Sequence, residues 1–232
     1  MLGIAVRIRG GSWASHGNWA SALALLIYAV AFSFAYVGLS AATGALLLFG
    51  AVQATMIGVG IGRGERLQAA QLAGLVLAVG GLVTLLLPGL AAPPTDRAAL
   101  MLGAGIAWGV YSLRGQGAGE ATRVNAGNFL RAAPVALVLG LFVSHGRSPD
   151  PAGLWYAVAS GALASGVGYA IWYAALPSLR STTAAVVQLS VPAIATLGGA
   201  LLLSEPITAR VLLASGAILG GIGIVVLGRR PA

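Results

Sequence analysis

The sequence predicts an all-α fold, that of a polytopic helical membrane protein with about eight transmembrane helices. Hydrophobic residues make up 58% of the 232 residues and charged residues only 8%, against about 25% charged residues in soluble domains. The apolar residues also form runs long enough to cross a bilayer, which takes about 20 residues. Because these runs are continuous rather than alternating apolar and polar, they favour helices over the strands of a β-barrel.

Eight spans result when the chain is divided at charges, Pro-Gly pairs and polar clusters. They cover residues 19–39, 42–62, 68–88, 98–114, 126–144, 151–175, 182–203 and 209–228. The boundary between the first two spans rests on length, because their combined apolar run would exceed one bilayer crossing. Residues 1–18 are predicted to be a cytoplasmic tail. Its apolar stretch is too short for a signal peptide, and no basic segment precedes it.

The arginines predict the orientation of these spans. All thirteen basic residues are arginine, and with eight spans nine of them fall on the side that both termini share, against three on the other side. This positive-inside bias places both termini in the cytoplasm. The arginines are scattered singly and form no stripe with interleaved aromatic residues, which argues against nucleic acid as a partner. The expected partners are the lipid bilayer and a small molecule.

Several classes of chemistry are disfavoured by residue usage. The chain has no cysteine, which removes disulfides, thiolate metal sites and cysteine nucleophiles. His16 and His145 lie in polar ends, and no serine stands in a nucleophile motif. All five acidic residues lie in loops or at span ends, so proton coupling through a buried carboxylate is not supported. We therefore expect no enzyme activity, no metal and no bound cofactor.

An internal repeat relates the two halves of the chain. About 45 residues match without a gap at an offset of 140, and Tyr36 and Leu39 meet Tyr173 and Leu176 just upstream, after a shift of three residues. The pairs are Thr43/Thr183, Ala45/Ala185, Gly58/Gly198, Glu65/Glu205, Leu72/Leu212, Gly80/Gly220, Gly81/Gly221 and Leu87/Leu227. Composition alone could match Ala- and Gly-rich helices, but the paired glutamates at one helix–helix junction argue for a true repeat.

The two copies are predicted to run in opposite directions through the membrane. Glu65 follows the second span, on the cytoplasmic side, whereas Glu205 follows the seventh span, on the external side. Inverted repeats of this kind are typical of secondary transporters, whose binding site lies near the midplane at the repeat interface. The repeat is the strongest functional signal in the sequence.

Short motifs in the second half resemble a known family. They are Leu201-Leu202-Leu203-Ser204-Glu205-Pro206, Gly220-Gly221-Ile222, Ala107-Trp108-Gly109-Val110-Tyr111, Asn128-Phe129-Leu130-Arg131 and Ser190-Val191-Pro192. Their order is similar to that of the EamA repeat of the drug/metabolite transporter (DMT) superfamily. The resemblance implies a complete second repeat of five helices over 98–228 and a partial first repeat of three helices over 19–88.

The resemblance also implies a function and a departure from the family pattern. Family members have ten helices in two repeats of five, so this chain would form an incomplete 3+5 inverted-repeat fold that lacks the first two helices, with residues 1–9 as the tail of the second. The implied function is that of a secondary transporter, an exporter of amino acid-like or drug-like metabolites by alternating access across a bacterial inner membrane. The alternative is a truncated, transport-incompetent protein that acts structurally or only within an oligomer such as a homodimer.

Polar and aromatic residues within the spans are the candidates for binding a solute. The expected cavity-lining residues are Tyr28, Gln53, Trp108, Tyr111, Asn128, Tyr169, Trp172 and Gln188. The aromatic residues fall in stripes at helical spacing, which also suits packing or lipid contact. The two glutamines fit interhelical hydrogen bonds equally well.

Other polar features have simpler expected roles. Glu65 and Glu205 are expected to anchor helix ends or to pair with Arg63, Arg66 or Arg210. Arg131 either reaches the interface or, with Asn128 one turn earlier, attracts an anionic group. Pro192 should kink the seventh span next to Gln188. The spacings Gly58/Gly62, Gly105/Gly109 and Gly216/Gly220 predict close helix packing.

Overall fold

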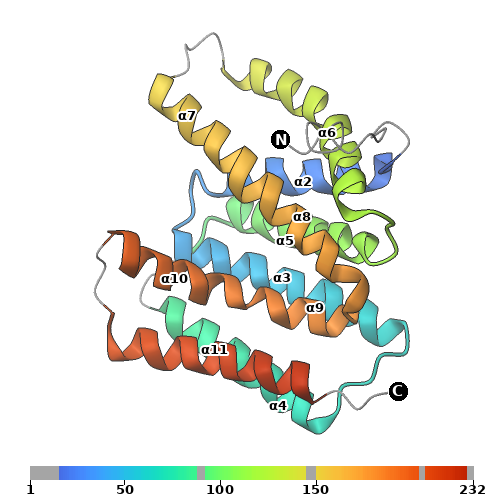
Figure 1. Cartoon of the computed structure of the whole chain (residues 1–232). Helices are drawn as coiled ribbons and strands as arrows, with labels where there is room; N and C mark the ends of the chain where they lie inside the picture. The colour runs from blue at the N-terminus through green and yellow to red at the C-terminus, as the bar shows by residue number, and fades with distance from the viewer. Residues whose placement is uncertain (1–15, 88–91, 145–149, 204–206, 229–232) are drawn as a thin grey trace. The chain divides into compact units, whose positions relative to one another are not determined.

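The computed structural model describes residues 16–87, 92–144, 150–203 and 207–228. In this part of the chain every regular element is helical (Figure 1). The elements are α2 (Trp19–Ala35), α3 (Ala41–Gly62), α4 (Ala69–Leu86), α5 (Thr95–Gly115), α6 (Ala121–Ser144), α7 (Pro151–Ala159), η2 (Ser160–Val167), α8 (Gly168–Ala175), η3 (Leu176–Ser178), α9 (Ser181–Gln188), α10 (Ser190–Leu203) and α11 (Ala209–Leu227). The all-α membrane fold predicted from composition is confirmed.

Each predicted span corresponds to helical structure, with shifted ends. Among the described residues, five stretches are long and apolar enough to cross a membrane: 41–62, 69–86, 121–142, 151–178 and 209–227. The helix α6 begins at Ala121, five residues before the predicted span. The predicted span starts later because Arg123 and Asn125 make the first turns polar, although these turns are helical. The helix α2 ends at Ala35 rather than at residue 39, and Arg97 donates to its Phe34 carbonyl over 2.8 Å.

The chain divides into two compact units. Unit 1 comprises residues 1–30 and 110–179, and unit 2 comprises residues 31–109 and 180–232. The divisions fall inside α2 and α5, so each of these helices contributes to both units. Unit 2 contains both copies of the sequence repeat, whereas unit 1 is formed around α6, η2 and α8.

The repeat is visible in the helix boundaries of unit 2. The helices α3 and α4 begin at Ala41 and Ala69, and α9 and α11 begin at Ser181 and Ala209, which is an offset of 140 in both cases. The first copy has one continuous helix where the second has α9 followed by α10. The interruption falls at Leu189, three residues before Pro192, which cannot donate a backbone hydrogen bond to Gln188.

The helices α4 and α11 pack against each other with antiparallel directions in unit 2 (Figure 1). A Cβ atom on Gly74 would lie 2.7 Å from the Gly221 carbonyl oxygen, and one on Gly81 would lie 2.8 Å from the Ala214 carbonyl oxygen. Residues 74 and 81 correspond to residues 214 and 221 at the repeat offset, so each contact is the counterpart of the other. Equivalent helices therefore meet in opposite directions, as an inverted repeat requires.

A hydrophobic core joins the second turn of α9 to the α4–α11 pair. Val186 and Leu189 are fully buried and pack with Leu82 of α4 and Ile218 of α11. Between membrane helices such side chains stabilise the contact through van der Waals packing rather than through removal of apolar surface from water. This packing leaves another face of α9 for contacts with α3.

Unit 1 anchors the start of α2 on α6. The backbone N–H of Asn18 donates to Asn128 Oδ1 over 3.0 Å, and Arg131 donates to the His16 carbonyl oxygen over 2.7 Å. Gly17 has φ +76°, a left-handed conformation that glycine adopts without a steric penalty. A Cβ atom on Gly127 would lie 1.9 Å from the His16 carbonyl oxygen, so this approach requires glycine.

Unit 1 also contains an irregular helix. Residues Ser160–Val167 form a π-helical segment between α7 and α8, in the span predicted over 151–175. π-Helical segments are uncommon and often occur at functional sites. The helix α7 itself has no buried residue among those described, as expected of a face that meets lipid.

Candidate functional site

An amide cluster, consisting of Gln53, Met56, Trp108 and Gln188, lies in unit 2 on helices α3, α5 and α9. The Gln53 amide donates to the Ala185 carbonyl oxygen over 2.7 Å. The Trp108 indole N–H donates to Gln188 Oε1. Both glutamines are more than nine-tenths buried, with exposed fractions of 7% for Gln53 and 6% for Gln188. Three predicted site residues, Gln53, Trp108 and Gln188, are therefore held on facing helices of one unit.

The hydrogen-bonding capacity of this cluster is only partly used. Gln53 Oε1 is buried and has no hydrogen-bond partner within the described part of the chain. Gln188 Nε2 donates to the Met56 sulfur over 3.1 Å and to the Ala184 carbonyl oxygen over 3.5 Å. A thioether is a weak acceptor and the second contact is long. The cluster thus keeps one acceptor and one weakly engaged donor in an apolar interior.

Glycines on α5 bring Trp108 close to α3. A Cβ atom on Gly105 would lie 2.6 Å from the Leu48 carbonyl oxygen, and one on Gly109 would lie 2.9 Å from the Thr55 side chain. The helix backbones therefore approach closely, as small residues allow in membrane helices. The predicted role of the Gly105/Gly109 spacing in close packing is confirmed. The same prediction for the spacings Gly58/Gly62 and Gly216/Gly220 is wrong, because a Cβ atom on any of these four glycines would meet nothing within 4 Å among the described residues. One consequence is that Trp108, beside Gly109, reaches Gln188 on α9.

A tyrosine cluster, consisting of Tyr28, Tyr111, Asn125, Tyr169 and Tyr173, lies in unit 1. The Tyr111 hydroxyl donates to Asn125 Oδ1 over 2.7 Å, and the Tyr173 hydroxyl donates to the Tyr111 carbonyl oxygen over 3.0 Å. The rings of Tyr111 and Tyr173 lie 4.8 Å apart between centroids. Tyr28 and Tyr169 share a side-chain hydrogen bond. Each of these tyrosines thus has a polar partner for its hydroxyl or an aromatic partner for its ring.

Asn125 holds the tyrosine cluster together. Its amide donates to the Ala121 and Tyr169 carbonyl oxygens, both over 3.1 Å, while its oxygen accepts from Tyr111. Asn125 is fully buried, so its amide is satisfied by protein groups. Nearby on the same helices, Trp172 donates to the Ser112 hydroxyl over 3.0 Å. The tyrosine cluster is therefore a largely satisfied network, in contrast to the amide cluster.

Asn128 and Arg131 occupy the anchor of α2. Asn128 is fully buried and accepts from the backbone N–H of Asn18, while its Nδ2 has no partner among the described residues. The Arg131 guanidinium donates to the carbonyl oxygens of His16 and Gly127, over 2.7 and 2.8 Å. Arg131 thus contacts backbone carbonyl groups of its own chain.

The eight predicted site residues are divided between the two units. Unit 2 holds Gln53, Trp108 and Gln188, and unit 1 holds Tyr28, Tyr111, Asn128, Tyr169 and Trp172. Sequence reasoning missed Met56 and Asn125. The sequence did carry a signal for Asn125. Two asparagines one helical turn apart, at positions 125 and 128, are unusual at the start of a membrane span. Met56 carried no signal, because a methionine in an apolar helix is ordinary core.

The acidic residue of the first repeat copy anchors a helix end, as the sequence predicted. Glu65 accepts hydrogen bonds from the first turn of α9, and its ion-pair partner is Arg180, with 3.8 Å between Nε and Oε2. Glu205 lies outside the described residues. Within the described part of the chain, no group of three His, Asp or Glu side chains could hold a metal ion.

This chain is similar to known proteins in family profile, in sequence and in fold. Residues 97–227 match the profile of the EamA-like transporter family. The chain is 56% identical over 216 residues to an uncharacterized protein of Pseudomonas aeruginosa, a match that covers 93% of this chain and 75% of that protein. It is also similar to a protein of known crystal structure, with a TM-score of 0.83 and 20% identity over 97% of this chain and 82% of the other. The structural similarity supports the fold alone.

Proposed function

This chain belongs to the EamA-like transporter family, and we propose that it exports amino acid-like or drug-like metabolites across the inner membrane of a bacterium. The family consists of membrane transporters of the drug/metabolite type rather than of enzymes, and the apolar helices make the chain a multi-pass membrane protein. We propose three further properties: the direction of transport, the class of solute and the orientation with both termini in the cytoplasm.

The partly used amides of unit 2 carry the proposal. Gln53 Oε1 is a buried acceptor without a partner among the described residues, and Gln188 Nε2 has only weak acceptors. Leaving such groups unpaired in an apolar interior costs free energy. A solute with one N–H or O–H donor and one acceptor would satisfy both, and the face of the Trp108 indole suits an apolar or aromatic part of the same solute.

Charge narrows the class of solute. The interiors of α3 and α9 contain no side chain that is charged at neutral pH, and the only such residues of α5, Asp96, Arg97 and Arg114, lie near its ends. A net charge on the solute would therefore meet no opposite charge beside the amide cluster, and its desolvation would be costly. This supports a neutral or zwitterionic solute.

Alternating access is the mechanism that the repeat supports. The two copies meet in opposite directions along α4 and α11, and the amide cluster joins α3 of the first copy to α9 of the second. Movement of one copy relative to the other would change access to groups shared between them. The amide cluster lies on such shared helices, so it is the proposed binding site.

Efflux from cells loaded with a panel of radiolabelled neutral amino acids tests this function. We expect Trp108→Ala and Gln188→Ala to reduce efflux of the transported amino acid at least tenfold, because each removes a contact to the solute. Tyr111→Phe should also reduce efflux, through loss of its hydrogen bond to Asn125. The abundance of each variant in the membrane is measured in parallel.

Trp155→Ala is the matched control, since this tryptophan on α7 is 74% exposed and should leave efflux unchanged. Normal efflux in the Trp108 and Gln188 variants would contradict the site. If the chain itself exports no member of the panel while the longer Pseudomonas aeruginosa relative does, the alternative of a transport-incompetent chain that needs a partner would be favoured.

A further inference from the structure

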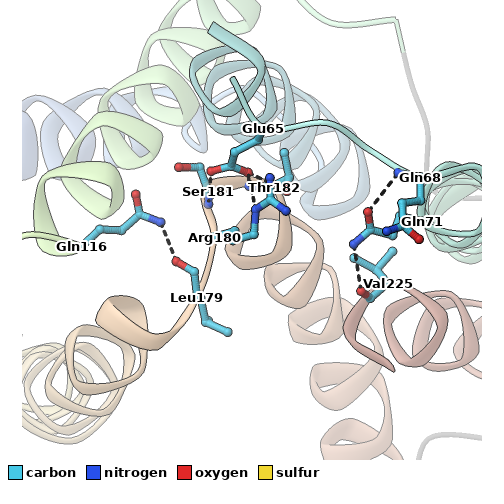
Figure 2. Close-up of polar contacts among 9 residues, drawn as sticks. All are labelled: Glu65, Gln68, Gln71, Gln116, Leu179, Arg180, Ser181, Thr182 and Val225. Atoms are coloured by element: carbon cyan, nitrogen blue, oxygen red, sulfur yellow. Dashed lines mark hydrogen bonds and ion pairs between the residues drawn. The ribbon is translucent and has the colours of Figure 1, made fainter. Parts of the chain in front are cut away.

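The first turn of α9 is capped from a distant part of the chain. The N-cap residue of α9, Arg180, provides no side-chain cap, although the first N–H groups of any helix need acceptors. The Glu65 carboxylate accepts from the Ser181 N–H over 2.9 Å, from the Thr182 N–H over 3.1 Å and from the Thr182 hydroxyl over 2.8 Å (Figure 2). A carboxylate in this position also interacts favourably with the helix dipole.

Glu65 is itself fixed at the end of α3. Its backbone N–H donates to the Gly60 carbonyl oxygen over 2.9 Å, across a turn in which Gly64 has φ +87°. A Cβ atom on Gly60 would lie 3.0 Å from both Glu65 Oε2 and the Thr182 methyl group. The absence of a side chain on Gly60 therefore lets the carboxylate and α9 approach α3 closely.

The two copies of the repeat differ at this cap. In the first copy, Ser40 caps α3 from its own N-cap position by accepting from the Thr43 N–H over 3.2 Å. The equivalent position in the second copy, at the offset of 140, is Arg180. The helix α9 thus lacks the local side-chain cap that its counterpart α3 has, and it receives its cap from Glu65 in the opposite copy.

The capped turn lies on the same helix face as the amide cluster. Residues 181, 185 and 188 follow the i, i+4, i+7 spacing of one face. Ser181 contacts Glu65, Ala185 accepts from Gln53, and Gln188 contacts Met56 and Trp108. Gln188 lies about 10 Å along the helix from Ser181, at 1.5 Å per residue. Because α9 is a continuous helix from Ser181 to Gln188, a contact that fixes the position of Ser181 also limits the position of Gln188.

We infer that Glu65 is a positioning residue, which binds the first turn of α9 from the end of α3 and thereby sets the depth and rotation at which α9 presents Gln188 to Trp108. This rests on the proposed function only in that the amide cluster is the proposed solute site. The geometry itself is testable without any solute, because the Trp108 indole N–H reports on its hydrogen bond to Gln188.

The experiment compares indole N–H signals of the ¹⁵N-labelled protein in detergent micelles. The Trp108 signal is assigned by its loss in Trp108→Phe, and Gln188→Leu gives its position without the hydrogen bond. In Glu65→Gln we expect the signal to move at least half of the way to the Gln188→Leu position. Ser40→Ala, which removes the local cap of the equivalent helix α3, is the matched control and should leave the signal unchanged.

A second variant separates positioning from helix capping. Glu65→Gln/Arg180→Ser gives α9 the local serine cap that α3 has, and we expect it to restore the thermal midpoint while the Trp108 signal stays displaced. The same double variant is measured if Glu65→Gln alone does not fold. Return of the signal to its original position in the double variant, or an unmoved signal in folded Glu65→Gln, would overturn the inference. Neither outcome depends on transport, so the efflux assay can contradict the proposed function without affecting this inference.

Discussion

Single residues show how strongly a membrane interior selects for paired polar groups. Gln53, Asn125, Asn128 and Gln188 are all buried, and each has at least one hydrogen bond to a neighbouring helix or segment. Asn125 uses its whole amide within unit 1. Gln53 and Gln188 do not, and neither does Asn128, whose Nδ2 has no partner among the described residues.

Glu65 gives a prediction for the dependence of stability on pH. Burial raises the pKa of its carboxyl, but the hydrogen bonds from Thr182 and Ser181 outweigh this effect, and the pKa is lowered in the folded protein. Because the pKa of this carboxyl is lower in the folded than in the unfolded protein, its ionised form stabilises the fold. This stabilisation is fully present above the pKa of the unfolded protein, about 4.3, and is lost as the pH falls through the pKa of the folded protein.

We therefore expect Glu65→Gln to lower the free energy of unfolding by about 1 kcal/mol at neutral pH, the usual contribution of a helix cap. This difference from the original chain should shrink as the pH falls through the lowered pKa of the folded protein, where the carboxyl becomes protonated. Thermal unfolding in detergent from pH 3 to pH 7 measures it. Ser40→Ala is the control, since a hydroxyl cap does not titrate and its loss should cost the same at every pH in this range.

At the scale of elements, the inverted repeat explains the packing of α4 on α11. The glycines that the sequence pattern marks as similar, Gly81 and Gly221, both lie at close approaches, whereas their neighbours Gly80 and Gly220 have open space. The repeat was readable from the sequence. Which of two adjacent glycines faces the partner helix depends on helix rotation, which the sequence does not state.

Gly221→Ala should destabilise the protein, because the added Cβ would lie 2.4 Å from the Gly74 carbonyl oxygen and 2.7 Å from the Ala78 nitrogen. Both are backbone atoms that cannot turn aside, so we expect a loss of about 1–3 kcal/mol, the cost of overpacking. Gly220→Ala meets nothing within 4 Å and should be neutral or slightly stabilising, since alanine favours helices. Equal unfolding midpoints for the two variants would contradict the packing.

At the scale of the whole molecule, the arginine distribution predicts orientation. The absence of cysteine allows single cysteines to be introduced at Pro93, between α4 and α5, and at Gly117, between α5 and α6, both of which are exposed. In intact cells a membrane-impermeant maleimide should label Pro93→Cys at least tenfold more strongly than Gly117→Cys. Permeabilisation should make labelling of the two positions similar, and the reverse pattern in intact cells would invert the proposed topology.

The sequence by itself determined the helical membrane class, the positions of the spans and the relation between the two copies. These features follow from composition, from the length of the apolar runs and from the similarity of the two halves of the sequence. None of these properties depends on which residues contact each other in the folded protein. The break near Pro192 was readable for the same reason, because proline removes a backbone donor wherever it stands in a helix.

Only the tertiary structure decided which polar groups meet. Trp108 and Tyr111 lie three residues apart on one helix, yet the first contacts Gln188 in unit 2 and the second contacts Asn125 in unit 1. Glu65 anchors a helix end as expected, but the end belongs to α9, more than 100 residues away. The physical reason is that hydrogen bonds between helices depend on helix rotation and depth, which the close approaches at glycines such as Gly60, Gly105 and Gly109 decide.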